Sequence, residues 1–325
     1  MNYTIVTGAA GFIGSKLVEG LNRRGITEVI AVDNLQHADK FRNLAGCEIA
    51  DYVDQAEFIA NLGRYEGAVE VVFHQGACSD TMESDGRYMM QNNFEYSKRL
   101  LEWCQAEEVP LIYASSASVY GSGPEFREER RCEKPLNVYG YSKFLFDQLV
   151  RQRLPVSKTQ IAGFRYFNVY GPNEAHKGRM ASVAYHAYHQ LLASGKVRLF
   201  VGSGGYGNGE QRRDFVYVED VVEVNLWFLE HREVSGVYNC GTGRAQSFNE
   251  LAAAVINAVQ GTRLSIQEMA HKSLIEYVPF PPGLLDKYQS YTQADLARLR
   301  AAGYAGAFRP VEQGVASYVA ELQRK

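Results

Sequence analysis

The feature that most constrains this chain is the glycine spacing in Thr7-Gly8-Ala9-Ala10-Gly11-Phe12-Ile13-Gly14. These residues follow a strand predicted at Tyr3–Thr7 and open a helix predicted over Gly11–Arg24. There the first glycine permits a tight turn, the second lets backbone approach a pyrophosphate, and the third lets the helix pack closely on the strand. The helix N-terminus adds free N–H groups for phosphates. The pattern predicts a dinucleotide-binding unit; the alternative is an ordinary glycine turn.

An acidic residue strengthens this prediction. Asp33 lies 19 residues after Gly14, at the end of a second strand predicted over Glu28–Val32, where a carboxylate can bond an adenosine ribose hydroxyl. Asp33 alone favours NAD, because its charge repels a 2′-phosphate. Asn34 and Lys40 could hold that phosphate if Asp33 turns away, so NADP stays open. The plainer interpretations are that Asp33 caps a helix and Lys40 is an exposed surface lysine.

Short β-branched runs alternate with helical patterns through the first half of the chain, which predicts an α/β fold with a Rossmann-type doubly wound parallel sheet. Further strands are predicted at Val69–His74, Leu111–Ala114 and Gln160–Phe164, and helices over Ala56–Leu62, Tyr88–Glu107 and Val138–Arg153.

The regular alternation of strand and helix patterns ends after Arg165, which predicts a smaller α/β substrate-binding domain. A helix is expected over Met180–Ala193, a flexible glycine-rich stretch at 202–209, and a strand at Gly236–Asn239 that returns to the sheet. The expected nucleotide-binding domain comprises residues 1–167 with returning segments near 215–244 and 289–309. The expected substrate domain comprises 168–214, 245–288 and 310–325.

Composition excludes several classes of protein. Hydrophobic residues make up 46% of the 325 and charged residues 22%, which is typical of globular domains rather than disordered chains. The formal charge of −3 does not favour nucleic-acid binding. No apolar run approaches the roughly 20 residues that a membrane helix needs, and the first residues lack an export signal. The five cysteines form no CxxC pair, so we expect no metal site and a reducing cytoplasm.

A second motif lies on the helix predicted over Val138–Arg153. Tyr139 and Lys143 are four residues apart and share a helix face, whereas Tyr141 lies on another. A lysine ammonium beside a phenol is expected to lower the phenol's pKa and make it a general acid/base. Ser116 ends the preceding strand, where a hydroxyl could bond the reacting oxygen. Such a spacing also occurs by chance in helices, so its meaning depends on the glycine motif upstream.

Together these motifs resemble the extended short-chain dehydrogenase/reductase superfamily and, within it, the ADP-heptose 6-epimerases. The resemblance covers nearly the whole chain. It rests on TGxxGxxG, Val32-Asp33-Asn34-Leu35, Gly76-Ala77-Cys78-Ser79, Tyr88-Met89-Met90, the serine stretch before Gly121, Lys134–Phe144, Phe164–Pro172, His176-Lys177-Gly178, Arg213–Val218 and a helix at Thr292-Gln293-Ala294-Asp295-Leu296.

The resemblance implies residue roles. Tyr139 and Lys177 would be acid/bases, Lys143 would bind the nicotinamide ribose, and Ser116 would bond near the reacting oxygen. The implied cofactor is NADP, with NAD as the alternative. Its expected binding residues are Gly8, Gly11, Phe12, Ile13, Gly14, Asp33, Asn34, Lys40, Gln55, Gln75, Gly76, Ala77, Cys78, Ser79, Asn92, Lys143 and Val169. The substrate contacts implied are Asn168, Arg179, His186, Phe200, Val201, Gly202, Ser203, Arg213 and Tyr288.

The implied reaction inverts C6″ of an ADP-heptose by transient oxidation to a ketone, within lipopolysaccharide inner-core synthesis. The family forms pentamers, so a homo-oligomer is expected. Two departures are Gln55, where the family often has a lysine, and a longer glycine-rich loop at 204–211. Without the resemblance, each of these residues has a plainer interpretation. Lys177 would be a surface lysine, His186 would be a packing or exposed histidine, and Arg213 and Asp214 would form a structural ion pair. The alternative functions are a nucleotide-sugar 4-epimerase or 4,6-dehydratase and a non-catalytic dinucleotide sensor.

Overall fold

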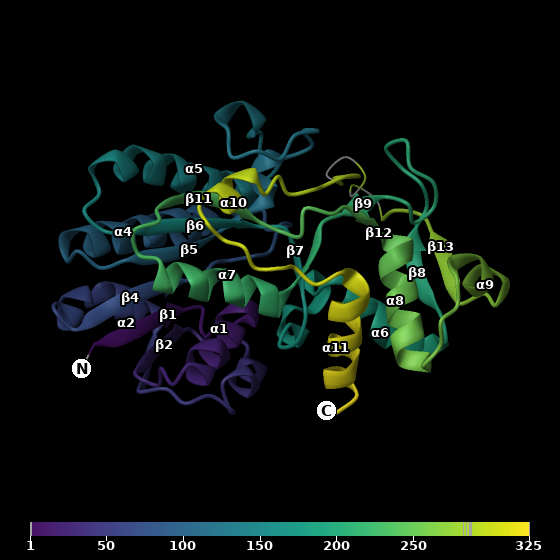
Figure 1. The fold of residues 1–325 in the computed structure, drawn as a ribbon, viewed down its shortest axis with the longest axis horizontal. Helices are drawn as coiled ribbons and strands as arrows, with labels where there is room; N and C mark the ends of the chain where they lie inside the picture. Colours follow the sequence, from purple (N-terminus) through teal and green to yellow (C-terminus); the bar gives the residue numbers. More distant parts are fainter. Residues whose placement is uncertain (1, 282, 284, 286–287, 325) are drawn as a thin grey trace.

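The centre of the molecule is a seven-stranded parallel sheet in the order β11-β6-β5-β4-β1-β2-β3 (Figure 1). The computed structural model describes residues 2–281, 283, 285 and 288–324. Its central strands are apolar runs buried on both faces, as parallel sheets require. The seven strands are β1 (Tyr3–Thr7), β2 (Val29–Asp33), β3 (Asp51–Asp54), β4 (Val69–His74), β5 (Leu111–Ser116), β6 (Ile161–Tyr166) and β11 (Gly236–Cys240).

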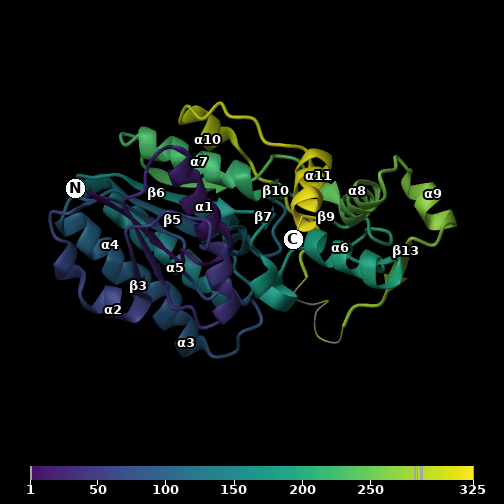
Figure 2. The same ribbon diagram turned by 90° about the horizontal axis from the view of Figure 1, so that it is seen from below.

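Helices cover both faces of this sheet, which confirms the doubly wound Rossmann-type fold (Figures 1 and 2). One face carries α1 (Phe12–Arg23) and α7 (Val218–Glu230), which pack on each other. The opposite face carries α2 (Gln55–Ala60), α3 (Gly86–Met90), α4 (Tyr96–Ala106) and α5 (Val138–Arg153).

The order of the strands places a ligand crevice between β1 and β4. The chain runs outward from β1 through β2 to β3, and then β4 returns to the other side of β1. Connections from these two neighbours therefore leave the sheet in opposite directions, which opens a crevice at their carboxyl ends. Thr7 and His74 are paired at this point of the ladder.

A second lobe stands beside the carboxyl ends of the strands (Figure 1). Its apolar core joins three helices to a parallel strand pair. These elements are α6 (Val183–Ser194), β8 (Val197–Phe200), α8 (Phe248–Gln260), β13 (Ile275–Val278) and α11 (Val311–Leu322), with α9 (Ile266–His271) at the far end. Short pairs link the lobes: β7 (Asn168–Tyr170) with β10 (Phe215–Tyr217), and β9 (Arg212–Arg213) with β12 (Gln246–Ser247). On this packing we propose the two-domain division expected from the sequence.

Three local expectations were wrong. The helix expected over Tyr88–Glu107 is interrupted by a π-helical turn at Gln91–Glu95, because side-chain periodicity does not report the backbone register. Helix α6 begins at Val183, since Ser182 caps it, and not at Met180. Residues Thr292–Leu296 are not helical. The helix there is α10 (Ala297–Ala301), and Asp295 accepts a hydrogen bond from the N–H of Ala297 at 2.9 Å.

Two further features were not anticipated. Strand β3 was missed because only Val53 among its four residues is buried, so it carries no apolar pattern. The glycine-rich stretch at 202–209 is held by specific bonds. Gln211 Nε2 donates to the Val201 carbonyl at 2.8 Å, and Asn208 Oδ1 accepts from the N–H of Gly202 at 2.8 Å. Within the described residues, no helix is long and apolar enough to cross a membrane.

Candidate active site

The glycine-rich loop between β1 and α1 is shaped for close approach. Gly8 has a φ of +66°, and a Cβ there would lie 2.7 Å from the Cα of Gly76 in the loop after β4. A Cβ on Gly14 would lie 2.0 Å from the Gly8 carbonyl oxygen. Gly11 is the N-cap residue that precedes α1, and no side chain of the described residues caps that helix end. Its first N–H groups and the helix dipole are therefore available to phosphates, so the loop fits a dinucleotide.

Asp33 and Lys40 lie together at the adenosine end of this loop. Asp33 Oδ2 accepts a hydrogen bond from the Ala10 N–H at 3.0 Å, and Oδ1 accepts from the Asn34 N–H at 2.8 Å. Lys40 Nζ forms an ion pair with the same carboxylate. Lys40 is therefore not the free surface lysine of the plainer interpretation, and its charge offsets that of Asp33.

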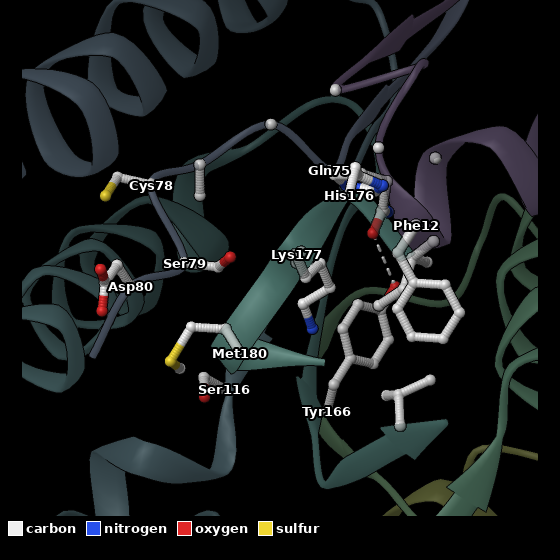
Figure 3. A pocket seen from close by; sticks show the side chains of 18 of the residues that line it. Phe12, Gln75, Cys78, Ser79, Asp80, Ser116, Tyr166, His176, Lys177 and Met180 are labelled. Carbon is white, nitrogen blue, oxygen red and sulfur yellow. Dashed lines mark hydrogen bonds between the residues drawn. The ribbon is translucent and has the colours of Figure 1, made fainter. Parts of the chain in front are cut away.

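A cavity of about 670 Å³ opens at the crevice between β1 and β4. Every residue expected to bind cofactor lines it, as do the four expected catalytic residues Tyr139, Lys143, Lys177 and Ser116. Figure 3 shows one wall of this cavity, where Gln75 Oε1 accepts a hydrogen bond from the Tyr166 hydroxyl at 3.1 Å. Residues as far apart in the sequence as Gly8 and Lys177 therefore share one cavity.

The π-helical turn shapes the loop beneath the cavity. Asn92 lines the cavity, whereas the next residue, Asn93, is buried and binds the backbone of Cys78 in both directions. Its Oδ1 accepts from the Cys78 N–H at 2.8 Å and its Nδ2 donates to the Cys78 carbonyl at 2.9 Å. π-turns are frequent at functional sites. This one holds the loop 76–79 in place.

Helix α5 presents Tyr139 and Lys143 to the cavity, while Tyr141 on another face is 45% exposed. The expected lowering of the Tyr139 pKa is not found. Burial raises the pKa of Tyr139, and a hydrogen bond with Ser116 opposes that shift. Lys143 Nζ instead donates to the Ala114 carbonyl at 2.8 Å, and burial lowers its pKa to about 8. Helix spacing places both residues on one face, but it does not direct the ammonium at the phenol.

Lys177 reaches the same cavity from a turn at Ala175–Met180 (Figure 3). Burial lowers the pKa of its ammonium, and the charge of Glu174 opposes the shift. Its Nζ lies 5.3 Å from the centroid of the Phe12 ring. A half-buried lysine at the cavity wall does not fit the surface-lysine interpretation.

The expected substrate residues fall into two groups. Asn168 and Arg179 line the cavity, and Arg179 forms an ion pair with Asp80 at 2.7 Å. The remainder do not line it. They lie in the second lobe or at its junction: His186, Phe200, Val201, Gly202, Ser203, Arg213 and Tyr288.

Arg213 anchors this second group. Its guanidinium lies 4.8 Å from the Tyr288 ring centroid and 5.6 Å from that of Phe248, and burial lowers its pKa. The structural-ion-pair alternative fails, because the Asp214 carboxylate is bonded by backbone N–H groups of Thr242, Gly243 and Ala294. No carboxylate of the described residues pairs with Arg213. A buried, unpaired guanidinium suits an anionic ligand group.

Sequence reasoning missed two histidines. His176 lines the cavity, and burial together with Lys40 and Lys177 lowers its pKa to about 4. Its place in the quoted His176-Lys177-Gly178 motif was a signal that could have found it. His74, buried beneath the glycine loop, had no such signal. The described part of the chain holds no cluster of metal-ligating side chains, and its five cysteines are free thiols.

Comparison with known proteins places this site in context. The sequence model of the NAD dependent epimerase/dehydratase family matches residues 4–241. The ADP-L-glycero-D-manno-heptose-6-epimerase of Thiobacillus denitrificans is 61% identical over 326 residues, covering 98% of each chain.

Solved structures agree with this match. The ADP-L-glycero-D-manno-heptose-6-epimerase of Helicobacter pylori superposes with a TM-score of 0.82 at 29% identity, covering 100% of this chain and 97% of that one. The UDP-glucose 4-epimerase of Thermus thermophilus, in complex with NAD, superposes with a TM-score of 0.79 at 28% identity, covering 99% of each.

Proposed function

Because this chain belongs to the NAD dependent epimerase/dehydratase family, we propose that it interconverts ADP-D-glycero-D-manno-heptose and ADP-L-glycero-D-manno-heptose by inverting C6″. The 61% identity to the Thiobacillus denitrificans epimerase over 98% of the chain supports this substrate. The structural observation that carries the proposal is that Tyr139 and Lys177, from separate elements, line one cavity with the glycine loop.

The chemistry explains why such a cavity is needed. C6″ carries a hydroxyl without an adjacent carbonyl, so its C–H is not acidic and a base alone cannot invert it. A nicotinamide dinucleotide, when bound, supplies a reversible acceptor of hydride. The glycine loop and the open end of α1 would hold its phosphates, and Asp33 and Lys40 its adenosine ribose.

The chain's own groups then handle protons. The Tyr139 phenolic oxygen would take or return the proton of the C6″ hydroxyl, with the Ser116 hydroxyl bonded beside it. When the sugar oxygen occupies its other position, the neutral Lys177 amine would take that proton and the resulting ammonium would return it. Lowering an ammonium pKa towards neutrality suits such an exchange, and burial lowers that of Lys177. Arg213 would bind the substrate's pyrophosphate with its planar fork.

We propose NADP as the cofactor, with NAD as the alternative. The support is the ion pair of Lys40 with Asp33, because a neutralised carboxylate no longer repels a 2′-phosphate. Gln55 lines the same end of the cavity and adds no charge. We further propose a cytoplasmic homo-oligomer, a pentamer by resemblance, that serves lipopolysaccharide inner-core synthesis.

The test is to incubate the purified protein with ADP-D-glycero-D-manno-heptose without added cofactor. The two C6″ epimers are then separated by anion-exchange chromatography. Conversion to a mixture is expected, since a tightly held cofactor copurifies. A lack of interconversion with NADP⁺ and NAD⁺ supplied would overturn the proposed substrate. UDP- and dTDP-hexoses would then test for a 4-epimerase or dehydratase. A lack of turnover with all of these nucleotide sugars would favour a non-catalytic sensor.

A further inference from the structure

Glu174 is a buried carboxylate in the segment that carries Lys177, and the reaction described above does not use it. Its side chain has no exposed surface. Its Oε1 accepts hydrogen bonds from the Gly171 N–H at 3.3 Å and from the Ser182 hydroxyl at 2.7 Å. Its Oε2 accepts from the Ser182 N–H at 2.5 Å. Gly171 and Ser182 are the two ends of the 171–182 segment, so a single carboxylate closes it into a loop.

The loop is thereby attached to the second lobe. Ser182 caps α6, and its Oγ also accepts a hydrogen bond from the Tyr185 N–H at 3.2 Å. Glu174 therefore sits at the N-terminus of α6, where the helix dipole favours a negative charge. Tyr318 of α11 hydrogen-bonds the same carboxylate. The closed loop thus rests on two helices of the second lobe.

The same residue reaches Lys177 in two ways. The Lys177 backbone N–H donates to the Glu174 carbonyl at 3.0 Å, which sets the turn. The Glu174 charge favours the Lys177 ammonium and opposes the effect of burial. Cationic groups also lie near, since the charges of Lys40 and Lys177 both lower the pKa of His176. Within the described part of the chain, the negative charge that acts on the Lys177 ammonium is that of Glu174.

We propose that Glu174 is a positioning residue for Lys177: it closes the 171–182 loop on the N-terminus of α6 and keeps a buried negative charge in the turn that carries the ammonium. This inference rests on the proposed function, in which Lys177 is an acid/base. It assigns Glu174 no contact with substrate or cofactor.

Three variants separate the charge from the anchorage. Glu174→Gln removes the charge and replaces one accepting oxygen by an amide NH₂, whereas Ser182→Ala removes one anchoring hydroxyl and keeps the charge. Glu233→Gln is the matched control, because this exposed carboxylate does not line the cavity. The holoenzymes are assayed for C6″ interconversion across pH. We expect Glu174→Gln to lower kcat about tenfold or more with a nearly unchanged KM, because the loop that positions Lys177 loses an anchoring hydrogen bond.

The pH profile gives a readout that a merely structural role would not move. Removing the negative charge makes the Lys177 ammonium lose its proton more easily. The limb of the kcat profile that reports Lys177 should therefore shift to lower pH in Glu174→Gln. It should stay in place in Ser182→Ala and Glu233→Gln, although Ser182→Ala lowers kcat.

A second measurement does not depend on the substrate. The rate at which acetic anhydride acetylates Lys177, followed across pH by peptide mass spectrometry, reports the pKa of its amine. We expect the midpoint to fall in Glu174→Gln and to stay in Glu233→Gln. If the wild type fails to convert ADP-heptoses, the proposed function is lost, but this shift still tests the link between Glu174 and Lys177.

Two results would overturn the inference. One is a wild-type kcat and an unshifted acetylation midpoint in Glu174→Gln. The other is a loss of kcat in parallel with thermal stability, with both pH readouts unmoved, because that result describes a structural residue only. If Glu174→Gln does not fold, Tyr318→Phe and Ser182→Ala decide: wild-type kcat in both would remove the anchoring role.

Discussion

Lys143 donates a hydrogen bond from Nζ to the carbonyl oxygen of Ala114 at 2.8 Å. The bond joins helix α5 to strand β5, two residues before Ser116. The bond therefore fixes the position of α5 relative to the end of β5, where Ser116 and Tyr139 meet. In this arrangement the lysine anchors the helix as well as lining the cavity.

Replacing Tyr139 by phenylalanine should remove most epimerisation. The change deletes the phenolic oxygen that handles the substrate proton and keeps the ring that fills the site. Acid/base catalysis contributes about 10²- to 10⁴-fold, so a loss of kcat in that range is expected in the anion-exchange assay. Tyr141→Phe, on an exposed face of the same helix, is the control and should stay active. Full activity of Tyr139→Phe would remove Tyr139 from the reaction.

His74 should make the protein less stable in mild acid. Its Nδ1 lies 2.6 Å from the Thr7 hydroxyl and its Nε2 lies 2.7 Å from the Ser97 hydroxyl. Ser97 donates onward to the Asn93 carbonyl, so it accepts from Nε2–H, and the ring is held neutral. Burial lowers the pKa of His74 to about 3 from its ordinary 6.5.

The unfolded chain therefore binds this proton first, and the free energy of unfolding falls as pH drops from 6.5 towards 3. Between pH 7 and pH 5 the contribution is about 2 kcal/mol. Urea unfolding of wild type and His74→Gln at both pH values measures it. The variant should have a lower free energy of unfolding than the wild type at pH 7. That free energy should, however, fall less than the wild-type value between pH 7 and pH 5. An equal loss in both proteins would contradict the neutral, buried histidine.

Lys40 should decide the preference between NADP and NAD. In Lys40→Met the Asp33 carboxylate keeps its N–H partners but loses its cation, so it repels a 2′-phosphate. A charged hydrogen bond contributes about 1.5–3 kcal/mol, which corresponds to roughly 10- to 100-fold in the Kd for NADP. The Kd for NAD should change little. Titration calorimetry on cofactor-stripped protein measures both.

The control for this substitution is Lys158→Met, which alters an exposed lysine that does not line the cavity. An equal change in the Kd for NADP and the Kd for NAD in Lys40→Met would show that Lys40 does not discriminate between the two cofactors.

Arg213→Lys should weaken substrate binding while leaving cofactor binding intact. Lysine keeps the charge but loses the planar fork that lies against Tyr288 and Phe248. We expect the KM for the ADP-heptose to rise about tenfold or more, with a smaller change in kcat. Arg198→Lys, at an exposed ion pair with Glu276, is the matched control. An unchanged KM in Arg213→Lys would place the substrate's pyrophosphate elsewhere.

Local sequence signals were sufficient wherever one segment sets its own geometry. The glycine spacing predicted the turn after β1, because a Cβ at Gly8 or Gly14 would collide with backbone. The four-residue spacing of Tyr139 and Lys143 predicted one helix face. Apolar runs predicted a buried parallel sheet, since strands covered by helices on both sides must be apolar along their whole length.

Short and irregular segments were not predictable in this way. Strand β3 has only one buried residue, and it exists because the edge of β2 offers it backbone partners. The residues of the π-turn at Gln91–Glu95 are typical of an ordinary helix, so the sequence does not indicate the turn. The role of Asn93 is seen only in the structure, where it bonds the backbone of Cys78. These features follow from partners that lie far away in the sequence.

The sequence by itself therefore determined the doubly wound fold, the dinucleotide loop and the residue types of the chemistry. The tertiary structure decided how those residues are charged and held. Burial raises the pKa of Tyr139 where spacing to Lys143 predicted a lowered one. Glu174 closes the Lys177 loop through Ser182 and Tyr318. Spacing along a chain sets local geometry, whereas desolvation and long-range partners exist only once separate elements have packed together.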